Sequence, residues 1–326
     1  MSDRVTVIVV NWNGRKFLSR CLDGLRKQTF RGFSTIVVDN GSTDGSVDFI
    51  RRRYPEIVVI SLSRNMGFCA GNNAALKHAE GEYVALINND AVPDPDWLMR
   101  LVEALDACPH AGFAASKMLF PGSPAIIDRA GDAYTWAGAG VLRGRGQSAE
   151  TYSRMAWIFG ACAGAAMYRS RMLEDIGWFD EDFFLLYEDV DLSFRAQLKG
   201  YGCVYVPDGI VRHMPSSTLR HDSPVSVYYG HRNLEWVYVK NLPAGLIAMT
   251  LFPHVVYVMA SFFFFLATGR GRTFVKAKKD ALKGLGGMLG KRRRIQRERR
   301  VDSRTILRLM GNEVLFSRLA SRFNNR

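Results

Sequence analysis

The feature that most constrains the fold is a short apolar run followed by a polar cluster, which occurs four times in the first 90 residues. Residues 5–10, 33–38, 57–60 and 83–87 are the apolar runs, and such runs are typical of strands buried on both faces. Between them, helical spacing of apolar residues or helix-capping residues predicts helices over residues 15–27, 45–53 and 70–79. Strands that alternate with helices predict an α/β fold with a mostly parallel, Rossmann-like sheet flanked by helices.

The polar clusters all follow the carboxyl ends of these predicted strands. Turns favour Asn, Asp, Gly and Ser, so a single cluster of this kind would be weak evidence for a site. Ligands of parallel α/β sheets bind beyond the carboxyl ends of the strands, and four successive clusters at that edge therefore favour one binding crevice. The clusters are Asn11-Trp12-Asn13-Gly14, residues 39–46, residues 64–73 and Asn88-Asn89-Asp90.

Three of these stretches together resemble family 2 glycosyltransferases of the GT-A fold, most closely the bacterial rhamnosyltransferase-like branch. They are Val-Asn-Trp-Asn-Gly at 10–14, Val-Val-Asp-Asn-Gly-Ser-Thr-Asp-Gly-Ser at 37–46 and Asn-Met-Gly-Phe at 65–68. By motif order, the resemblance covers about residues 4–241. It implies an inverting enzyme that takes a sugar from a nucleotide-sugar donor, with rhamnose on thymidine diphosphate as the donor that this branch suggests. It also implies that Asp39 contacts the nucleotide base, and that Asn11, Asn65 and Gly67 help to wall the nucleotide pocket.

Asn88-Asn89-Asp90 occupies the position of the family's Asp-x-Asp metal motif. A donor pyrophosphate needs a hard divalent cation, Mn²⁺ or Mg²⁺, and such cations prefer carboxylate oxygen. Because only Asp90 keeps a carboxylate, it is the expected metal ligand, and Asn88 and Asn89 are assigned to the donor site. Capping of a helix near residue 94 is the alternative role for Asp90. The family resemblance also allows His213 to complete the metal coordination, although a lone histidine is more often structural.

A second acidic cluster, Glu188, Asp189 and Asp191, begins a helix predicted over residues 187–199. Carboxylates there would complement the helix dipole, but the aromatic residues ahead of them indicate a partly buried site where a carboxylate can act as a base. The resemblance implies that Asp189 is the general base and that Glu188 lines the acceptor site. Asp191 and Arg195 are expected to orient the helix. The sequence indicates no role for four further residues of a family-like stretch: Tyr228, Tyr229, Arg232 and Asn233.

The last part of the chain differs in character, which divides it into a catalytic domain at 1–241 and a membrane-associating helical region at 242–326. Residues 244–268 contain no Asp, Glu, Lys or Arg. From residue 269 onwards there are 18 Lys and Arg against 4 Asp and Glu, whereas the preceding residues carry a net charge of −1. Basic amphipathic segments are predicted at 274–289 and 306–323. Flanking Lys and Arg tend to stay cytoplasmic, so the region is expected to lie on, or re-enter, the cytoplasmic face of the plasma membrane.

Other functional classes are disfavoured by particular features. A processive polysaccharide synthase would carry Gln-x-x-Arg-Trp, where this chain reads His-Arg-Asn-Leu-Glu-Trp at 231–236. A dehydrogenase would carry Gly-x-Gly-x-x-Gly after the first strand. The run Lys-Arg-Arg-Arg-Ile-Gln-Arg at 291–297 belongs to no nucleic-acid-binding module, so no nucleic-acid partner is expected. The five scattered cysteines predict neither disulfides nor a zinc site. A glycan or lipid-linked acceptor is expected, and the oligomeric state is left open.

Overall fold

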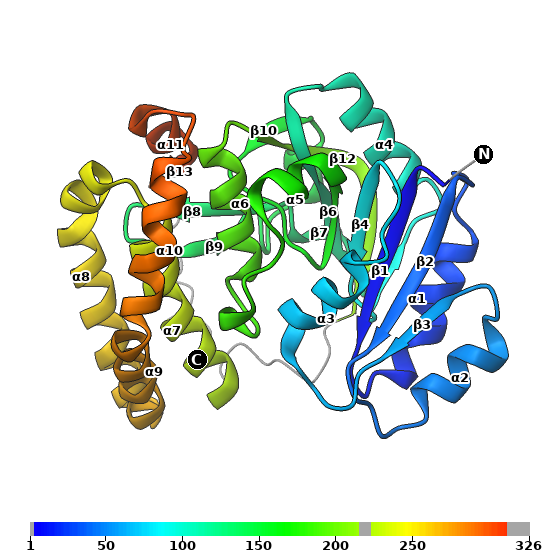
Figure 1. The fold of residues 1–326 in the computed structure, drawn as a ribbon, viewed down its shortest axis with the longest axis horizontal. Helices are drawn as coiled ribbons and strands as arrows, with labels where there is room; N and C mark the ends of the chain where they lie inside the picture. The colour runs from blue at the N-terminus through cyan, green and yellow to red at the C-terminus, as the bar shows by residue number, and fades with distance from the viewer. Residues whose placement is uncertain (1–2, 215–222, 312–326) are drawn as a thin grey trace.

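The N-terminal part of the chain forms the expected alternation of strands and helices. A computed structural model describes residues 3–214 and 223–311. Each predicted element is present within a few residues of its expected bounds (Figure 1). The observed elements are β1 (Val5–Asn11), α1 (Arg15–Arg26), β2 (Phe33–Asp39), α2 (Ser46–Arg53), β3 (Val58–Ser61), α3 (Gly67–Leu76), β4 (Tyr83–Ile87), β5 (Ala91–Pro93), α4 (Trp97–Ala107) and β6 (Ala111–Phe120).

These strands lie in a large mixed sheet whose main order is β10-β12-β6-β11-β4-β1-β2-β3. Strands β3, β2, β1 and β4 are parallel neighbours, and β12 is parallel to β6. β11 lies antiparallel between β4 and β6. The strands in this order not yet bounded are β10 (Ala156–Ile158), β11 (Ala165–Arg169) and β12 (Gly202–His213). The α/β, mostly parallel prediction is therefore confirmed.

The sheet is covered on both faces, and this explains the continuous apolar strands. Alternate residues of β1 enter different cores: Val5, Val7 and Val9 pack with α1 and α4, whereas Ile8 packs with the core that contains α3 and α6 (Glu188–Leu198). A strand with both faces buried needs apolar residues at every position, because each side chain leaves water. The polar residues are thereby confined to the strand ends.

Two middle segments add strands to the sheet and beside it. Residues 121–150 form hairpins: β7 (Ser123–Arg129) pairs with β6, and β8 (Asp132–Thr135) pairs with β9 (Gly140–Leu142). The apolar region over residues 155–168 contributes two strands, β10 and β11, at separate places in the sheet. An isolated bridge between Gly160 and Asp132 redirects the chain between them, which an apolar composition alone cannot indicate.

The C-terminal part is a group of helices beside the sheet, on the side away from β1, β2 and β3 (Figure 1). Trp236 Nε1 donates to Ala281 O at 3.0 Å, and Arg292 donates to Val239 O and Leu242 O at 2.6 Å. The predicted boundary at residue 241 falls at the end of a helix that these contacts join to two later helices. Residues 312–323 of the second amphipathic segment lie outside the described residues. The helices are α7 (Pro224–Asn241), α8 (Ala244–Ala267), α9 (Gly271–Lys283), α10 (Leu285–Arg297) and α11 (Ser303–Leu309).

Candidate active site

The carboxyl ends of β1, β2 and β4 bring their polar clusters together. Asn11 and Asp39 are paired in register at the ends of β1 and β2, and Asn11 Nδ2 donates to Asp39 Oδ1 at 3.0 Å. Asn89, which follows β4, donates to Asn11 Oδ1 at 2.8 Å. Gly14 makes room for this contact, since a Cβ there would lie 2.0 Å from Asn89 Nδ2. The predicted convergence on one sheet edge is present, and neighbouring strands cause it.

Asp39 is almost completely buried, with 2% of its surface exposed. Its Oδ2 accepts from the backbone N–H of Ser42 at 2.9 Å, in addition to the bond from Asn11. Asn13 joins the same loop, because Thr43 N donates to Asn13 Oδ1 at 2.8 Å. Asp39 therefore fixes the loop after β2, and each of its oxygens keeps a further lone pair that can accept a hydrogen bond.

The loop at residues 65–67 is held by Asn40, a residue that the sequence did not single out. Asn40 Nδ2 donates to Asn65 Oδ1 and to Gly67 O, and Asn40 Oδ1 accepts from Met66 N at 2.8 Å. Gly67 has φ +89°, and a Cβ there would lie 2.6 Å from Phe184. Gly67 is thus required both by its left-handed backbone and by the close approach of the loop that precedes Glu188.

The predicted metal ligands, Asp90 and His213, come together through pairing of β12 with β5. His213 is in register with Ala91, which places its Nε2 3.4 Å from Asp90 Oδ1. Asp90 is 5% exposed, and its Oδ1 accepts no hydrogen bond within the described residues. Asp90 does not cap the next helix, because α4 begins at Trp97 with Asp96 as its N-cap.

His213 is oriented from its other side by Asp128, the second residue that sequence reasoning missed. Asp128 Oδ2 lies 2.8 Å from His213 Nδ1, an arrangement that commonly orients metal-binding histidines. Burial lowers the pKa of His213, but Asp128 and Asp90 outweigh it and raise the pKa to about 9. A metal would therefore have to displace a proton from His213.

A carboxylate oxygen and an imidazole nitrogen at this separation fit two ligands of a Mn²⁺ or Mg²⁺ ion. The described residues contain no group of three or more His, Cys, Asp or Glu arranged to hold a metal. Other ligands would therefore have to come from the donor's phosphates or from water. Asn88 lies against Gly164, because a Cβ added to Gly164 would be 2.9 Å from Asn88 Nδ2.

Glu188 and Asp189, the first two residues of α6, are both largely buried but differ in their partners, since Asp189 accepts from Val190 N and lies 3.7 Å from Arg129. The Asp189 side chain is 13% exposed, and Glu188 is 8% exposed with an Oε2 that has no hydrogen-bond partner within the described residues. Burial, together with the neighbouring Asp189, raises the pKa of Glu188 well above its ordinary value. Adjacent carboxyl groups in different environments can serve different roles, Glu188 as a neutral hydrogen-bond donor and Asp189 as a base.

The loop before α6 has an unusual backbone that α7 holds in place. Phe184, Leu186 and Tyr187 all have positive φ, which is costly for residues with side chains. Asn233 Nδ2 donates to three carbonyls of this loop, Phe183 O, Leu185 O and Leu186 O, at 2.7–2.9 Å. Arg232 donates to one further carbonyl, Asp182 O, and also to Phe183 O, and Tyr229 stacks on Phe184. These contacts supply the role that the sequence could not indicate.

Buried ion pairs fix α6 from behind. Arg195 Nε donates to Asp191 Oδ2 at 2.9 Å and also binds three carbonyls at residues 176–178, so this pair orients the helix as expected. Lys240 of α7 lies 2.8 Å from Asp191 and 2.5 Å from Asp180. Lys291 of α10 pairs with Asp180 at 2.5 Å. Part of the basic segment after residue 269 is therefore bound to the loop that leads into Glu188 and Asp189.

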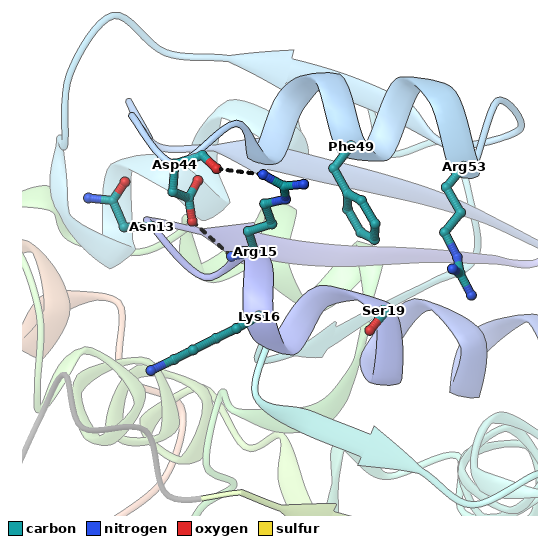
Figure 2. Close-up of a pocket in the computed structure, with 7 residues that line it drawn as sticks. All are labelled: Asn13, Arg15, Lys16, Ser19, Asp44, Phe49 and Arg53. Atoms are coloured by element: carbon teal, nitrogen blue, oxygen red, sulfur yellow. Dashed lines mark hydrogen bonds between the residues drawn. The ribbon is translucent and has the colours of Figure 1, made fainter.

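A separate hollow of about 590 Å³ lies at the start of α1, outside this arrangement (Figure 2). Its cationic side chains are Arg15, Lys16 and Arg53, and Asp44 fixes the Arg15 backbone N–H at 2.9 Å. Asp90 and Asp189 are not among its lining residues, so the hollow is not where the predicted chemistry would occur. The remaining lining residues are Asn13, Ser19 and Phe49.

Comparison with known protein families decides the family of the chain. Residues 6–177 match the model described as "Glycosyl transferase family 2". The chain belongs to glycosyltransferase family 2. It is therefore a nucleotide-sugar glycosyltransferase, and the predicted family is confirmed. Among curated members, an N-acetylglucosaminyl-diphospho-decaprenol L-rhamnosyltransferase of Mycobacterium tuberculosis is 27% identical over 75% of this chain and 87% of its own length.

Solved structures of glycosyltransferases show the same fold. S. aureus TarS 1-349, in complex with UDP-GlcNAc, matches 91% of this chain and 90% of its own with a TM-score of 0.60 and 20% identity. The mannosyltransferase PcManGT from Pyrobaculum calidifontis, in complex with GDP-Man and Mn²⁺, covers 91% of this chain and 84% of its own, with a TM-score of 0.55 and 20% identity. The chain spans only 43% of a longer TarS structure. At these identities the similarity establishes the GT-A fold alone.

Proposed function

We propose that this family 2 enzyme transfers a sugar, with inversion, from a nucleotide sugar to a glycan or lipid-linked acceptor at the cytoplasmic face of the plasma membrane. The observation that supports the proposal is that two neighbouring residues of β7 contact both parts of the predicted site. Asp128 lies 2.8 Å from His213, which lies 3.4 Å from Asp90, and Arg129 lies 3.7 Å from Asp189. The mycobacterial relative, an N-acetylglucosaminyl-diphospho-decaprenol L-rhamnosyltransferase, supports rhamnose as the first sugar to test and a diphospholipid-linked sugar as the first acceptor. Thymidine diphosphate as the carrier of the rhamnose follows from the family resemblance alone. The predicted catalytic domain, 1–241, would carry this activity.

In the proposed reaction, Asp189 accepts the proton of an acceptor hydroxyl as that oxygen attacks the anomeric carbon. The bond to the nucleoside diphosphate breaks, and its oxygen keeps the electron pair. Asp90 and His213 would hold a divalent cation, which when bound supplies positive charge for the diphosphate. Asp39, Asn11, Asn65, Gly67, Asn88 and Asn89 would hold the nucleotide sugar.

The function is tested by release of nucleoside diphosphate from a panel of nucleotide sugars. The reaction contains a polyprenyl-diphosphate-linked acceptor and either Mn²⁺ or a chelator. We expect release with one donor, dependent on acceptor and metal. Release that is equal with the chelator would contradict metal dependence, and failure of every nucleotide sugar with the lipid-linked acceptor would contradict the proposed substrate class.

Replacing Asp90 with alanine should weaken metal-dependent donor binding far more than replacing His213 with alanine. The carboxylate supplies negative charge as well as a lone pair, whereas the imidazole supplies only a lone pair. We expect a loss of about 100-fold or more for Asp90→Ala and about tenfold for His213→Ala, the scale at which metal-site substitutions act. Isothermal titration with nucleoside diphosphate and Mn²⁺ measures both. An unchanged affinity in Asp90→Ala would disprove the metal site.

The membrane part of the proposal rests on the two sides of α8. Among the described residues, α8 is the single helix long and apolar enough to cross a membrane. Its protein-facing side carries His254, whose ring nitrogens lie 2.8 Å from Ala137 O and 3.0 Å from Glu235 Oε2. Thr250 on that side bonds Tyr238 at 3.0 Å. The opposite side exposes large apolar residues: Met249, Leu251, Phe252, Val255, Val256, Met259, Phe263 and Leu266.

This polarity favours a helix that lies along the membrane surface. Burial would raise the pKa of Glu235, but His254 and Lys278 reverse this and lower the pKa to about 2. A crossing helix would separate His254 from this buried, charged partner, which is costly. Helices α9 and α10 expose basic residues that suit anionic headgroups: Arg272, Lys276, Lys279, Lys283, Arg293 and Arg297.

Replacing both Phe252 and Phe263 with glutamate should therefore release the protein from membranes. Each buried phenylalanine contributes about 1.5–3 kcal/mol, so binding should fall by about 100-fold or more. Co-sedimentation with phosphatidylglycerol vesicles measures this, and Val58→Glu is the matched control because Val58 is an exposed apolar residue on the distant strand β3. If the double variant bound vesicles as tightly as the wild type, the exposed side of α8 would not be the membrane-binding surface. Retention on DNA in place of vesicles would favour the nucleic-acid alternative.

Topology is tested separately with a cysteine at Asn324, a position outside the described residues. We expect an impermeant thiol reagent to label Asn324→Cys only after spheroplasts are lysed. Labelling of intact spheroplasts would show that α8 crosses the membrane and places the basic tail outside.

A further inference from the structure

The inserted hairpin delivers one arginine into the group of carboxylates around the proposed base. Arg129 is the last residue of β7, and its side chain is 20% exposed. Its Nη1 lies 3.7 Å from Asp189 Oδ2 and 3.6 Å from Asp132 Oδ1. These are ion-pair distances, and no hydrogen bond donated by the Arg129 guanidinium is found within the described residues. The cation is therefore held by charge between two acidic groups, one of them on α6.

A cation is needed here because acidic side chains gather around Asp189. Glu188, Asp189 and Asp132 gather from α6 and β8, and Asp132 is 3% exposed. Like charges this close disfavour one another's ionised forms, so an unopposed cluster would take up protons. Arg129 opposes that tendency for Glu188 as well, since its charge lowers the raised pKa of that residue while burial and Asp189 raise it.

The same strand supports the metal side of the site. Asp128, the preceding residue, holds His213, and it is also paired with Arg145 at 2.6 Å. Neighbouring residues of β7 thus reach the two halves of the proposed active site. A shift of this strand would move both Asp128, beside His213, and Arg129, beside Asp189. The hairpin is therefore a structural part of the proposed active site.

We propose that Arg129 is a positioning residue whose charge offsets the acidic neighbours of Asp189 and which holds the Asp189 carboxylate toward the acceptor hydroxyl. This inference rests on the proposed function, in which Asp189 is the base. A base must be deprotonated before it can accept a proton, so a nearby cation extends activity to lower pH. Arginine also constrains the carboxylate's direction, which a mobile counter-ion would not do.

The test compares the pH dependence of kcat in Arg129→Met and Arg129→Lys with that of the wild type. Removing a cation within 4–6 Å of a carboxylate makes ionisation harder, and we expect the acidic limb for Arg129→Met to move up by about one pH unit. Its plateau kcat should fall by about 10–100-fold from the lost orientation. Arg129→Lys should keep the wild-type acidic limb and lose only part of the plateau, because it keeps the charge but not the position of Nη1 between Asp189 and Asp132.

The matched control is Arg143→Met, which removes a cation from the same hairpin. Arg143 lies over the rings of Tyr152 and Tyr205 and donates to Ala130 O, and no ion pair to a carboxylate is found for it within the described residues. We expect its acidic limb to stay in place. Other titratable groups around Asp189 are present in all variants, so the comparison holds them constant: Glu188, Asp132, Cys69, Cys162 and Tyr168.

Asp189→Asn is measured alongside, so that failure of the proposed role of Arg129 can be distinguished from failure of the proposed base. If Asp189→Asn is inactive and the acidic limb of Arg129→Met is unmoved, the role of Arg129 is overturned while the proposed base stands. If Asp189→Asn retains activity, both are overturned. A purely structural role for Arg129 would lower the melting temperature of both Arg129 variants and leave the limb unchanged, which also counts against the proposal.

Discussion

Asp189→Asn is expected to reduce sugar transfer to below about one hundredth of the wild-type rate, since general-base catalysis typically contributes about 10²–10⁴-fold. The amide has nearly the shape of the carboxylate but cannot take the proton of the acceptor hydroxyl. Donor binding should be nearly unchanged, because the nucleotide site is assigned to residues after β1–β4. Single-turnover transfer and donor titration measure the two quantities separately.

Glu188→Gln is the matched variant, one residue away. Burial and the neighbouring Asp189 raise the pKa of Glu188, which favours its neutral form, and the glutamine amide is also neutral and can donate a hydrogen bond. We therefore expect a loss of less than about tenfold, the scale of one altered neutral hydrogen bond. A larger loss in Glu188→Gln than in Asp189→Asn would exchange the two assignments. Substantial turnover in Asp189→Asn would leave the enzyme without its proposed base.

Among the substitutions proposed for this protein, Lys240→Met should cause the largest loss in the free energy of unfolding. Lys240 is 2% exposed and lies between Asp180 and Asp191, and Asp191 is fully buried. Removing one partner of a buried ion pair costs about 3–5 kcal/mol in the free energy of unfolding, because the remaining charge stays in the interior. Urea denaturation measures this change. Lys283→Met is the control, since Lys283 is 67% exposed and its solvent-screened ion pair with Asp280 should contribute little to stability.

The same pair determines how stability depends on pH. Burial would raise the pKa of Asp191, but Lys240 and Arg195 reverse this and lower it to about 2. Because the folded pKa lies below that of an unfolded aspartate, about 3.9, the carboxylate stabilises the fold above that pH. The stabilisation is lost as pH falls through about 2. In Lys240→Met the loss should begin at a higher pH. An unchanged acid-unfolding midpoint would show that Lys240 is not the dominant partner.

The coupling between Lys240, Lys291 and Asp180 changes the interpretation of the basic tail. Its charge suggested an anionic partner outside the protein, yet Lys291 is bound to Asp180 and Asp182. Lys278 is likewise bound to Glu235 of α7. The exposed basic residues remain available to headgroups, whereas these lysines join the C-terminal helices to the catalytic loop. A truncation at the predicted boundary, 241, would remove Lys291 and expose buried parts of α7.

The sequence alone determined the α/β class and the sheet edge that carries the site. Strands buried on both faces require unbroken apolar runs, and polar residues can then occur only where the strands end. Asn11, Asp39 and Asp90 could be found for that reason, and the family motifs identified the enzyme class. The apolar, charge-free character of α8 was likewise visible, since it is a local property of the chain.

Tertiary structure decided which distant residues complete the site. Asp128 meets His213 only because β7 and β12 both pair with β6, and Arg129 reaches Asp189 only because the hairpin folds back over α6. Asn233 and Arg232 support the 182–186 backbone across about 50 positions of sequence. Hydrogen bonds and ion pairs depend on a few ångströms of separation, and strand order and helix packing set that separation. Spacing along the sequence does not determine that separation, so these partners could be identified only from the folded structure.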